Sequence, residues 1–358
     1  MYGQRTFPFI LALCKDIREA GAPGAMLLNC SNPMAMNTWA ANLYGGVPTV
    51  GLCHGVQHGH QQIAEALGLK QSEVDIVCAG INHQTWYIQV RHNGKDMTRE
   101  PLAAFERHPV FSKQEKVRID MLRRFGYYST ESNGHLSEYV PWYRKRPDEI
   151  AEWIDLSEWI HGETGGYLRY CREQRNTFEE EYNRWREEPP YAYGPERRSQ
   201  EHGSYILEGL ETGRTYRGHF NVVNRGAITN LPPDSVVEVP GYVDANGISI
   251  PIVGDLPLGP AAVCNVSVSV QRLAVEAAIR GDEQLLRQAM MMDPVVGAVC
   301  NPPEIWQMVD EMLVAQTAWL PQYGEAVGKA KVRLANGKRF PTRQWEGAAR
   351  LKLKQNRG

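Results

Sequence analysis

The first ninety residues alternate between short apolar runs and longer segments of helical spacing, and this alternation is what most constrains the fold. Apolar residues recur at roughly helical intervals over residues 9–20, 34–43 and 57–67. Compact apolar runs, which predict buried strands, lie at residues 25–29, 47–52, 74–79 and 85–90. Strands that alternate with helices in this way favour an α/β fold with a parallel sheet.

Three polar side chains lie just after predicted strands. They are Asn32, Cys53 and His83, each close behind a different strand. Ligands of open α/β sheets bind beyond the carboxyl ends of the strands, so we expect these three side chains to share one site. Cysteine and histidine side chains gathered where strands end are what a transition metal needs.

Cys53 and His83 are the preferred metal pair. A thiolate and an imidazole together suit Zn, Mn, Fe, Co or Ni. Two protein ligands would leave positions open for a substrate or water, as in catalytic sites. A plainer interpretation also fits the spacing, with Cys53 a buried apolar residue and His83 a hydrogen-bonded histidine at a strand end. The residues alone leave both interpretations open.

Three histidines follow Cys53 within seven residues, at positions 54, 58 and 60. His54 and His58 stand four residues apart and would share a helix face. A histidine beside a metal ligand can act as a general acid or base. We expect this role for His54, at the strand end, and expect His58 and His60 to be ordinary surface or core histidines.

Residues 130–142 are dense in titratable and aromatic groups. Tyr139 can serve as a base if a cation lowers its pKa. Glu131 and Glu138 are candidate general acids, although a solvated surface position is the commoner case for a carboxylate. Asn32, before Pro33, can orient a substrate hydroxyl or carbonyl, but a helix-starting turn without a ligand fits equally well.

The rest of the chain carries fewer chemical signals. Residues 102–200 are mostly helical, polar and aromatic, and an Asn-Gly turn at residues 246–247 predicts a hairpin between strands at 236–243 and 248–253. Helices are expected at residues 270–280 and 303–320. From Gly328 onward the chain is rich in Lys and Arg with little apolar periodicity, which predicts a disordered tail.

Composition excludes several classes of protein. The formal net charge is −2, which gives no reason to expect nucleic acid or an anionic membrane as a partner. No apolar run approaches the roughly 20 residues that span a bilayer, and no leader-like segment opens the chain. Seven cysteines without a framework pattern indicate reduced thiols and a cytoplasmic location.

Several stretches together resemble glycoside hydrolase family 4, the NAD- and metal-dependent glycosidases. They run in order along most of the chain, and the run from Asn32 to Trp39 is most similar to the α-galactosidase (melibiase) branch. The matching stretches lie at residues 29–39, 51–57, 78–83, 130–142, 238–248 and 292–294.

The resemblance implies a fold and a division of the chain. Residues 1–84 would form the remainder of a Rossmann-like, lactate/malate dehydrogenase-like parallel sheet that lacks its first strands. Residues 85–327 would form a larger α+β C-terminal domain, and residues 328–358 the basic tail. No Gly-x-Gly-x-x-Gly follows a strand anywhere in the chain, so the NAD-binding residues stay unidentified.

The resemblance also implies a mechanism unlike that of most glycosidases. NAD+ removes hydride from C3 of the sugar, a base removes the acidified C2 proton, the glycosidic oxygen leaves, water adds, and the retained NADH reduces C3 again. By position, Cys53 and His83 resemble the ligands of Mn2+, or another divalent metal, which chelates the C2 and C3 oxygens. Asn32 resembles a substrate contact, His54 the residue that assists the leaving group, and Tyr139 the C2 base.

Two departures from the family pattern keep alternatives open. Gly55 stands where the melibiase branch has serine, so the identity of the sugar is open. An α-galactoside is the preferred substrate, and the alternatives are the substrates of an α-glucuronidase or an α-glucosidase of the same family. The first half of the nucleotide-binding unit is missing, which predicts a longer native product and impaired activity of this chain. A 2-hydroxy-acid dehydrogenase relative and an inactive fragment are the further alternatives. The family implies a homo-oligomer, a dimer or a tetramer, acting on a small-molecule glycoside.

Overall fold

The computed structural model describes residues 1–146, 149–154, 177–190, 194, 197–337 and 339–341. The strands are β1 (Leu27–Asn29), β2 (Thr49–Gly51), β3 (Val74–Ile81), β4 (Gln84–His92), β5 (Lys95–Asp96), β6 (Tyr216–Val223), β7 (Val236–Asp244) and β8 (Gly247–Ser249). The first eight α-helices are α1 (Tyr2–Ala20), α2 (Met34–Ala40), α3 (Gly55–Leu67), α4 (Glu100–Arg107), α5 (Phe111–Gln114), α6 (Lys116–Phe125), α7 (Asn133–Glu138) and α8 (Ile150–Trp153). The later ones are α10 (Thr177–Glu187), α11 (His202–Thr212), α12 (Leu258–Arg280), α13 (Glu283–Met292), α14 (Pro294–Val299), α15 (Pro302–Ala315) and α16 (Gly324–Asn336).

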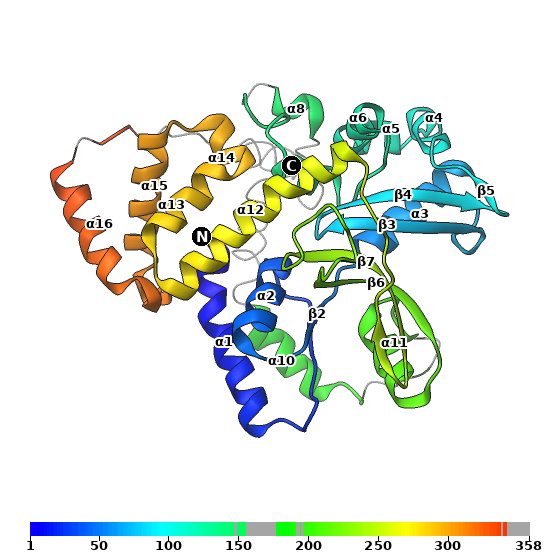
Figure 1. Ribbon diagram of the computed structural model, residues 1–358, viewed down its shortest axis with the longest axis horizontal. Helices are drawn as coiled ribbons and strands as arrows, with labels where there is room; N and C mark the ends of the chain where they lie inside the picture. The colour runs from blue at the N-terminus through cyan, green and yellow to red at the C-terminus, as the bar shows by residue number, and fades with distance from the viewer. Residues whose placement is uncertain (147–148, 155–176, 191–193, 195–196, 338, 342–358) are drawn as a thin grey trace.

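One mixed sheet holds all of the described strands. Its order is β1-β2-β6-β7-β3-β4-β5, with β8 paired to β7 (Figure 1). Strands β1 and β2 pair in parallel, as the α/β pattern predicts, and the remaining pairings are antiparallel. Strands β6 and β7 come from far along the chain and lie between β2 and β3, so neighbours in sequence are not neighbours in the sheet.

Parallel pairing, expected for the whole sheet, does not extend to β3 and β4. Only Asn82 and His83 separate the two strands, and Ile81 pairs with Gln84 across the turn. A connection of two residues can join only antiparallel strands, because a parallel pair needs a long crossover. The predicted hairpin is confirmed, with Asp244 of β7 paired to Gly247 of β8, but its second strand spans Gly247–Ser249 and not residues 248–253.

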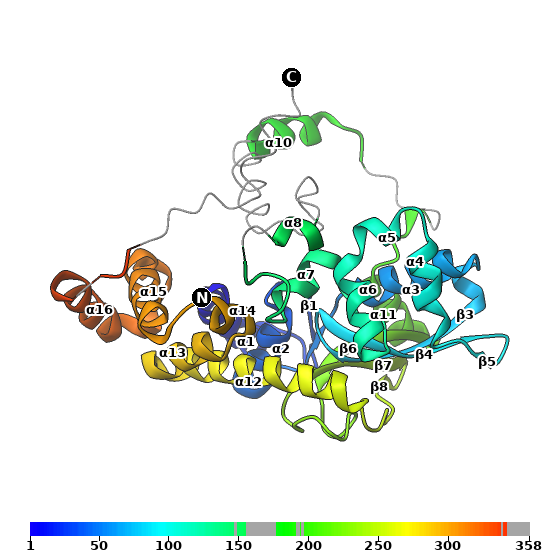
Figure 2. The same cartoon turned by 90° about the horizontal axis from the view of Figure 1, so that it is seen from above.

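The two faces of the sheet are covered by different helices, which Figure 2 shows from above. Side chains alternate along β3, so Ala79 and Ile81 join the core beneath α12, while Ile76 and Cys78 join a second core beneath α3, α4 and α6. In β4, Trp86 joins the first of these cores and Tyr87 joins the second. The ends of the central strands are therefore held rigidly from both sides.

Helix α12 crosses the molecule diagonally in Figure 1 and connects the sheet to the C-terminal helices. By length and composition alone it is apolar enough to cross a membrane. Cys264, Val268 and Val275 on this helix lie in the main core, so part of its apolar surface is buried within the protein. Helix α13 packs alongside the C-terminal half of α12, and α15 and α16 extend this group of helices, whose core includes Ala277 of α12 (Figure 1).

The disordered tail predicted from Gly328 is wrong for residues 328–336, which belong to α16. Ala326, Val327 and Ala330 are buried against α13 and α15, and the Arg333 guanidinium binds the carboxylate of Asp310. Small alanines give little apolar periodicity, so the packing was hidden in the sequence. Residues 342–358 of the predicted tail lie outside the described residues.

The predicted domain boundary at residues 84 and 85 falls at the start of β4. Strands from both sides of that boundary are neighbours in one sheet, since β2 pairs with β6 and β3 with β4. The division into 1–84 and 85–327 stays a prediction. The end of β2 and the turn between β3 and β4 lie close together, because the donor atoms of Cys53 and His83 are within 4.8 Å of each other.

Candidate metal centre

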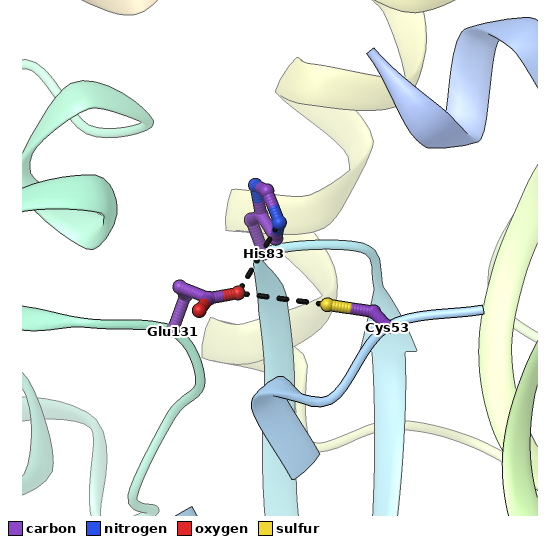
Figure 3. A group of neighbouring side chains, drawn as sticks. All are labelled: Cys53, His83 and Glu131. Atoms are coloured by element: carbon purple, nitrogen blue, oxygen red, sulfur yellow. Dashed lines mark hydrogen bonds and ion pairs between the residues drawn. The ribbon is translucent and has the colours of Figure 1, made fainter. Parts of the chain in front are cut away.

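Cys53, His83 and Glu131 converge from three segments of the chain, as Figure 3 shows. Oε2 of Glu131 lies 3.2 Å from Nε2 of His83 and 3.6 Å from Sγ of Cys53. The three donor atoms all lie within 4.8 Å of one another. A thiol, an imidazole and a carboxylate so close together form a donor set for a divalent metal ion such as Zn2+ or Mn2+.

One residue, Leu52, separates Cys53 from the end of β2, and one residue, His54, separates it from the start of α3. The strand can approach α2 closely because Gly51 has no side chain, and a Cβ there would collide with Met34, Thr38 and Asn221. Backbone N–H of Gly55 donates to Sγ of Cys53 at 3.4 Å, which favours the thiolate. The sequence prediction that Cys53 lies at a strand end is confirmed.

His83 occupies the tight turn between β3 and β4. Its φ is 62°, in the left-handed region that non-glycine residues seldom adopt. Such outliers persist where the surrounding structure fixes them, and they cluster at functional sites. The turn directs the imidazole towards Glu131, and the side chain of His83 is 11% exposed.

Glu131 is brought to the site by backbone pairing with β4. Ser129 bridges Trp86, the N–H of Thr130 donates to the carbonyl of Thr85 at 2.8 Å, and the hydroxyl of Thr130 accepts from the N–H of Thr85 at 3.0 Å. The segment 129–131 therefore runs beside the start of β4, next to the turn that holds His83. The Glu131 side chain is 13% exposed.

Burial sets the protonation of the cluster. It raises the pKa of the Cys53 thiol well above its ordinary value, helped by the carboxylates of Glu238 and Glu131. Burial lowers the pKa of His83, which keeps the imidazole neutral at neutral pH, the form that binds metal. Burial opposes ionisation of Glu131, and the pKa of that carboxyl is lowered only to the extent that His83 and His135 carry a proton.

A second layer of residues supports the two predicted ligands. Nδ1 of His83 lies 3.1 Å from the hydroxyl of Tyr139. Nε2 of His202 lies 3.2 Å from the carbonyl oxygen of Cys53, and Nδ1 of His202 lies 2.7 Å from the hydroxyl of Tyr216. Metal-binding histidines usually have their second nitrogen fixed in this way.

The cluster opens into a cavity that contains most of the other sequence candidates. Asn32, His54 and His58 line it together with Cys53, His83 and Glu131. His54 lies at its rim, with a side chain 66% exposed, and Nδ1 is 3.8 Å from a carboxylate oxygen of Glu201. The side-chain oxygen of Asn32 accepts a hydrogen bond from the N–H of Met34.

His60 does not line this cavity. Its Nε2 is 2.7 Å from the carbonyl oxygen of Val74, and it lines a different cavity together with residues of β3 and β6. His58 does line the metal cavity, so the structure separates the two histidines that the sequence interpretation had grouped as bystanders. The roles of these residues in catalysis stay predictions.

Sequence reasoning considered Glu131 only as a general acid and missed its contact with the metal pair. It also missed His135, whose ring centroid lies 5.4 Å from that of His83, and His202 behind Cys53. A signal for Glu131 and His135 existed in the dense segment 130–142. Nothing near His202 in sequence points to Cys53, which is 149 residues away.

A second cavity adjoins the metal cavity and shares Asn32, Met34 and Asn82 with it. Tyr139 and Gln271 of α12 also line this second cavity. The side-chain oxygen of Gln271 is buried and has no hydrogen-bond partner in the part of the chain that the structure describes. A buried acceptor without a donor is costly unless a ligand supplies one.

Comparison with known proteins gives a consistent result. Residues 1–69 match the family model "Family 4 glycosyl hydrolase", and residues 78–296 match "Family 4 glycosyl hydrolase C-terminal domain". An α-galactosidase of Rhizobium meliloti (strain 1021) is 62% identical over 99% of this chain and 72% of its own length. An α-galactosidase of Bacillus subtilis (strain 168) is 34% identical over 89% of this chain and 72% of its own length.

A solved structure shows the same fold. It is the 6-phospho-β-glucosidase of Thermotoga maritima with manganese, NAD+ and glucose-6-phosphate, which superposes with a TM-score of 0.68 at 20% identity, over 88% of this chain and 71% of that one. Fold and sequence thus place the protein among the glycosidases. It belongs to family 4 of the glycosyl hydrolases, in the α-galactosidase branch. The dehydrogenase alternative is thereby excluded.

Proposed function

We propose that the protein hydrolyses α-galactosides with NAD+ and Mn2+, by oxidation at C3, proton removal at C2, elimination, water addition and reduction at C3. The observation that carries the proposal is the convergence of Cys53 and His83 on one buried point at the end of the sheet. The relatives support the substrate, since an α-galactosidase is 62% identical. They also support the cofactors, since a family structure holds manganese and NAD+.

The donor set fits Mn2+. Cys53 and His83 would hold the ion, with the imidazole neutral and the thiol losing its proton on binding. When bound, the metal supplies Lewis-acid catalysis at the sugar C2 and C3 oxygens. The cavity beside the cluster gives a sugar access to the ligands from one side.

Tyr139 is the proposed base for the C2 proton. Its hydroxyl lies 3.1 Å from Nδ1 of His83, so it stands beside the metal centre. Burial raises the pKa of Tyr139 well above its ordinary value, with the Glu138 and Glu131 carboxylates adding to the rise. A nearby divalent cation opposes that rise and favours the phenolate, the form that accepts a proton.

His54 and Asn32 are proposed to handle the substrate. His54 at the rim would assist the departing glycosidic oxygen, and its contact with Glu201 orients the imidazole. Asn32 lies where the metal cavity and the adjoining cavity meet, and would contact the sugar there. We propose that the adjoining cavity takes the reactive end of NAD+, which supplies hydride transfer at C3, because a hydride acceptor must lie next to the bound sugar.

The test is release of nitrophenol from a set of 4-nitrophenyl α-glycosides: galactoside, glucoside and glucuronide. We expect the galactoside to be cleaved fastest, only with NAD+ and Mn2+ present, and expect EDTA to abolish the reaction reversibly. Equal activity after EDTA, or without NAD+, would contradict the mechanism. Faster cleavage of the glucuronide would show that the substrate is an α-glucuronide, the alternative that Gly55 left open.

A further inference from the structure

We propose that Glu131 is the third protein ligand of the metal ion, so that the centre is a Cys–His–Glu set rather than a Cys–His pair. The inference rests on the proposed function only in taking Cys53 and His83 as ligands. It assigns to the Glu131 carboxylate a direct bond to the ion, in place of the general-acid role considered from the sequence.

The distances carry the argument. Ligand atoms bound to one ion at about 2.0–2.3 Å lie about 3–3.6 Å from each other when the angles at the ion are between a right angle and tetrahedral. Oε2 of Glu131 lies 3.2 Å from Nε2 of His83 and 3.6 Å from Sγ of Cys53. A single oxygen thus stands at ligand spacing from both predicted ligands at once.

The surroundings of Glu131 are consistent with this assignment. Its side chain is only 13% exposed, and Oε2 is the oxygen that contacts both His83 and Cys53. Among the described residues no Lys or Arg forms an ion pair with it. A buried carboxylate without a paired cation is costly, and a bound divalent ion removes that cost.

Gly55 leaves the space that this carboxylate occupies. A Cβ at position 55 would lie 2.9 Å from Oε2 of Glu131, closer than real side-chain carbons approach. The end of a glutamate side chain can move, so a larger residue here would displace the oxygen and leave the backbone in place. The residue at position 55, which is glycine here and serine in the melibiase branch, therefore affects how much room the Glu131 carboxylate has.

Direct Mn2+ binding, followed by electron paramagnetic resonance of the free ion and by calorimetry, tests the assignment without any turnover. Glu131→Gln keeps the size of the side chain and removes its charge. We expect it to weaken Mn2+ binding by more than about tenfold, the scale already seen for outer-shell partners of metals. Glu131→Asp should recover part of the loss, because it restores the negative charge on a shorter side chain.

Glu201→Gln is the matched control, because Glu201 lines the same cavity but contacts His54 at the rim. It should bind Mn2+ as the wild type does. Cys53→Ser separates the two proposals. If Cys53→Ser binds Mn2+ normally, the proposed metal centre itself fails. If Cys53→Ser loses Mn2+ while a folded Glu131→Gln binds it with wild-type affinity, the metal centre stands and the third-ligand assignment is overturned.

Discussion

Nε2 of His202 lies 3.2 Å from the carbonyl oxygen of Cys53, so a buried histidine of α11 holds the backbone of a predicted metal ligand. A carbonyl only accepts, so Nε2 carries the proton and Nδ1 accepts from the hydroxyl of Tyr216 at 2.7 Å. His202 is 2% exposed, and burial lowers its pKa, which keeps the ring neutral. The pair fixes one tautomer and thereby the position of the Cys53 loop.

His202→Gln should weaken Mn2+ binding by about 10- to 100-fold, the range for outer-shell partners of metal ligands. The reason is that the Cys53 loop loses its fixed hydrogen bond while Cys53 itself is retained. Calorimetric titration with Mn2+ measures the change. The matched control is His60→Gln, because Nε2 of His60 also lies beside a backbone carbonyl, that of Val74, which holds no ligand. Equal weakening in both variants would reduce His202 to a structural role.

Tyr139→Phe should lower kcat by about 10²- to 10⁴-fold at saturating Mn2+, since the variant lacks the group that accepts the C2 proton. Steady-state rates at saturating metal and NAD+ give the measurement. Tyr143→Phe is the control from the same segment, because its hydroxyl donates to Asp120 at 2.9 Å, away from the metal cavity. A Tyr139→Phe variant that keeps its full kcat would exclude Tyr139 as the base.

The metal pair could be proposed because local patterns place both residues just after strands, Cys53 after the run 47–52 and His83 after 74–79. The rule for parallel strands does not itself join them, because β2 and β3 run in opposite directions, with β6 and β7 between them. Their separation in the sheet could not be predicted, since β6 and β7 from beyond residue 215 insert between β2 and β3. Local periodicity carries no information about which distant strands pair.

Glu131 and His202 show where local reasoning stops. Glu131 reaches the site through pairing of Ser129 with Trp86, 43 residues earlier in the chain, and His202 reaches Cys53 from α11. Such contacts depend on the assembled tertiary structure. In the same way, α16 was hidden because Ala326 and Ala330 bury little apolar area and the basic residues around them are typical of a tail.

Glu238 predicts a pH dependence of stability. It is buried in β7, and burial raises its pKa from 4.5 to about 7, although the Thr85 hydroxyl donates to the carboxylate at 2.6 Å. A raised folded pKa means that the unfolded chain releases this proton first. Its contribution is therefore fully present below about pH 4.5 and is lost as the pH rises through about 7, by about 3 kcal/mol in total.

Urea unfolding of wild type and Glu238→Gln between pH 5 and 8, with EDTA present, measures this contribution. The neutral glutamine cannot titrate, so the wild type should lose stability relative to the variant as the pH increases, with no further change above the folded pKa. Parallel curves for the two proteins would show that Glu238 is already ionised in the folded state.

The C-terminal helices give the last prediction. Asp310 of α15 binds Arg287 of α13 and Arg333 of α16, and the Arg287 side chain is only 1% exposed. Asp310→Asn leaves Glu283 as the one carboxylate paired with the buried guanidinium among the described residues, and should lower the free energy of unfolding by about 3 kcal/mol. Arg333→Ala removes a guanidinium that is 41% exposed and should cost about 1 kcal/mol or less. Urea unfolding compares the two variants. Equal losses would mean that the connection to α16, rather than the buried Arg287 charge, governs the stability of this cluster.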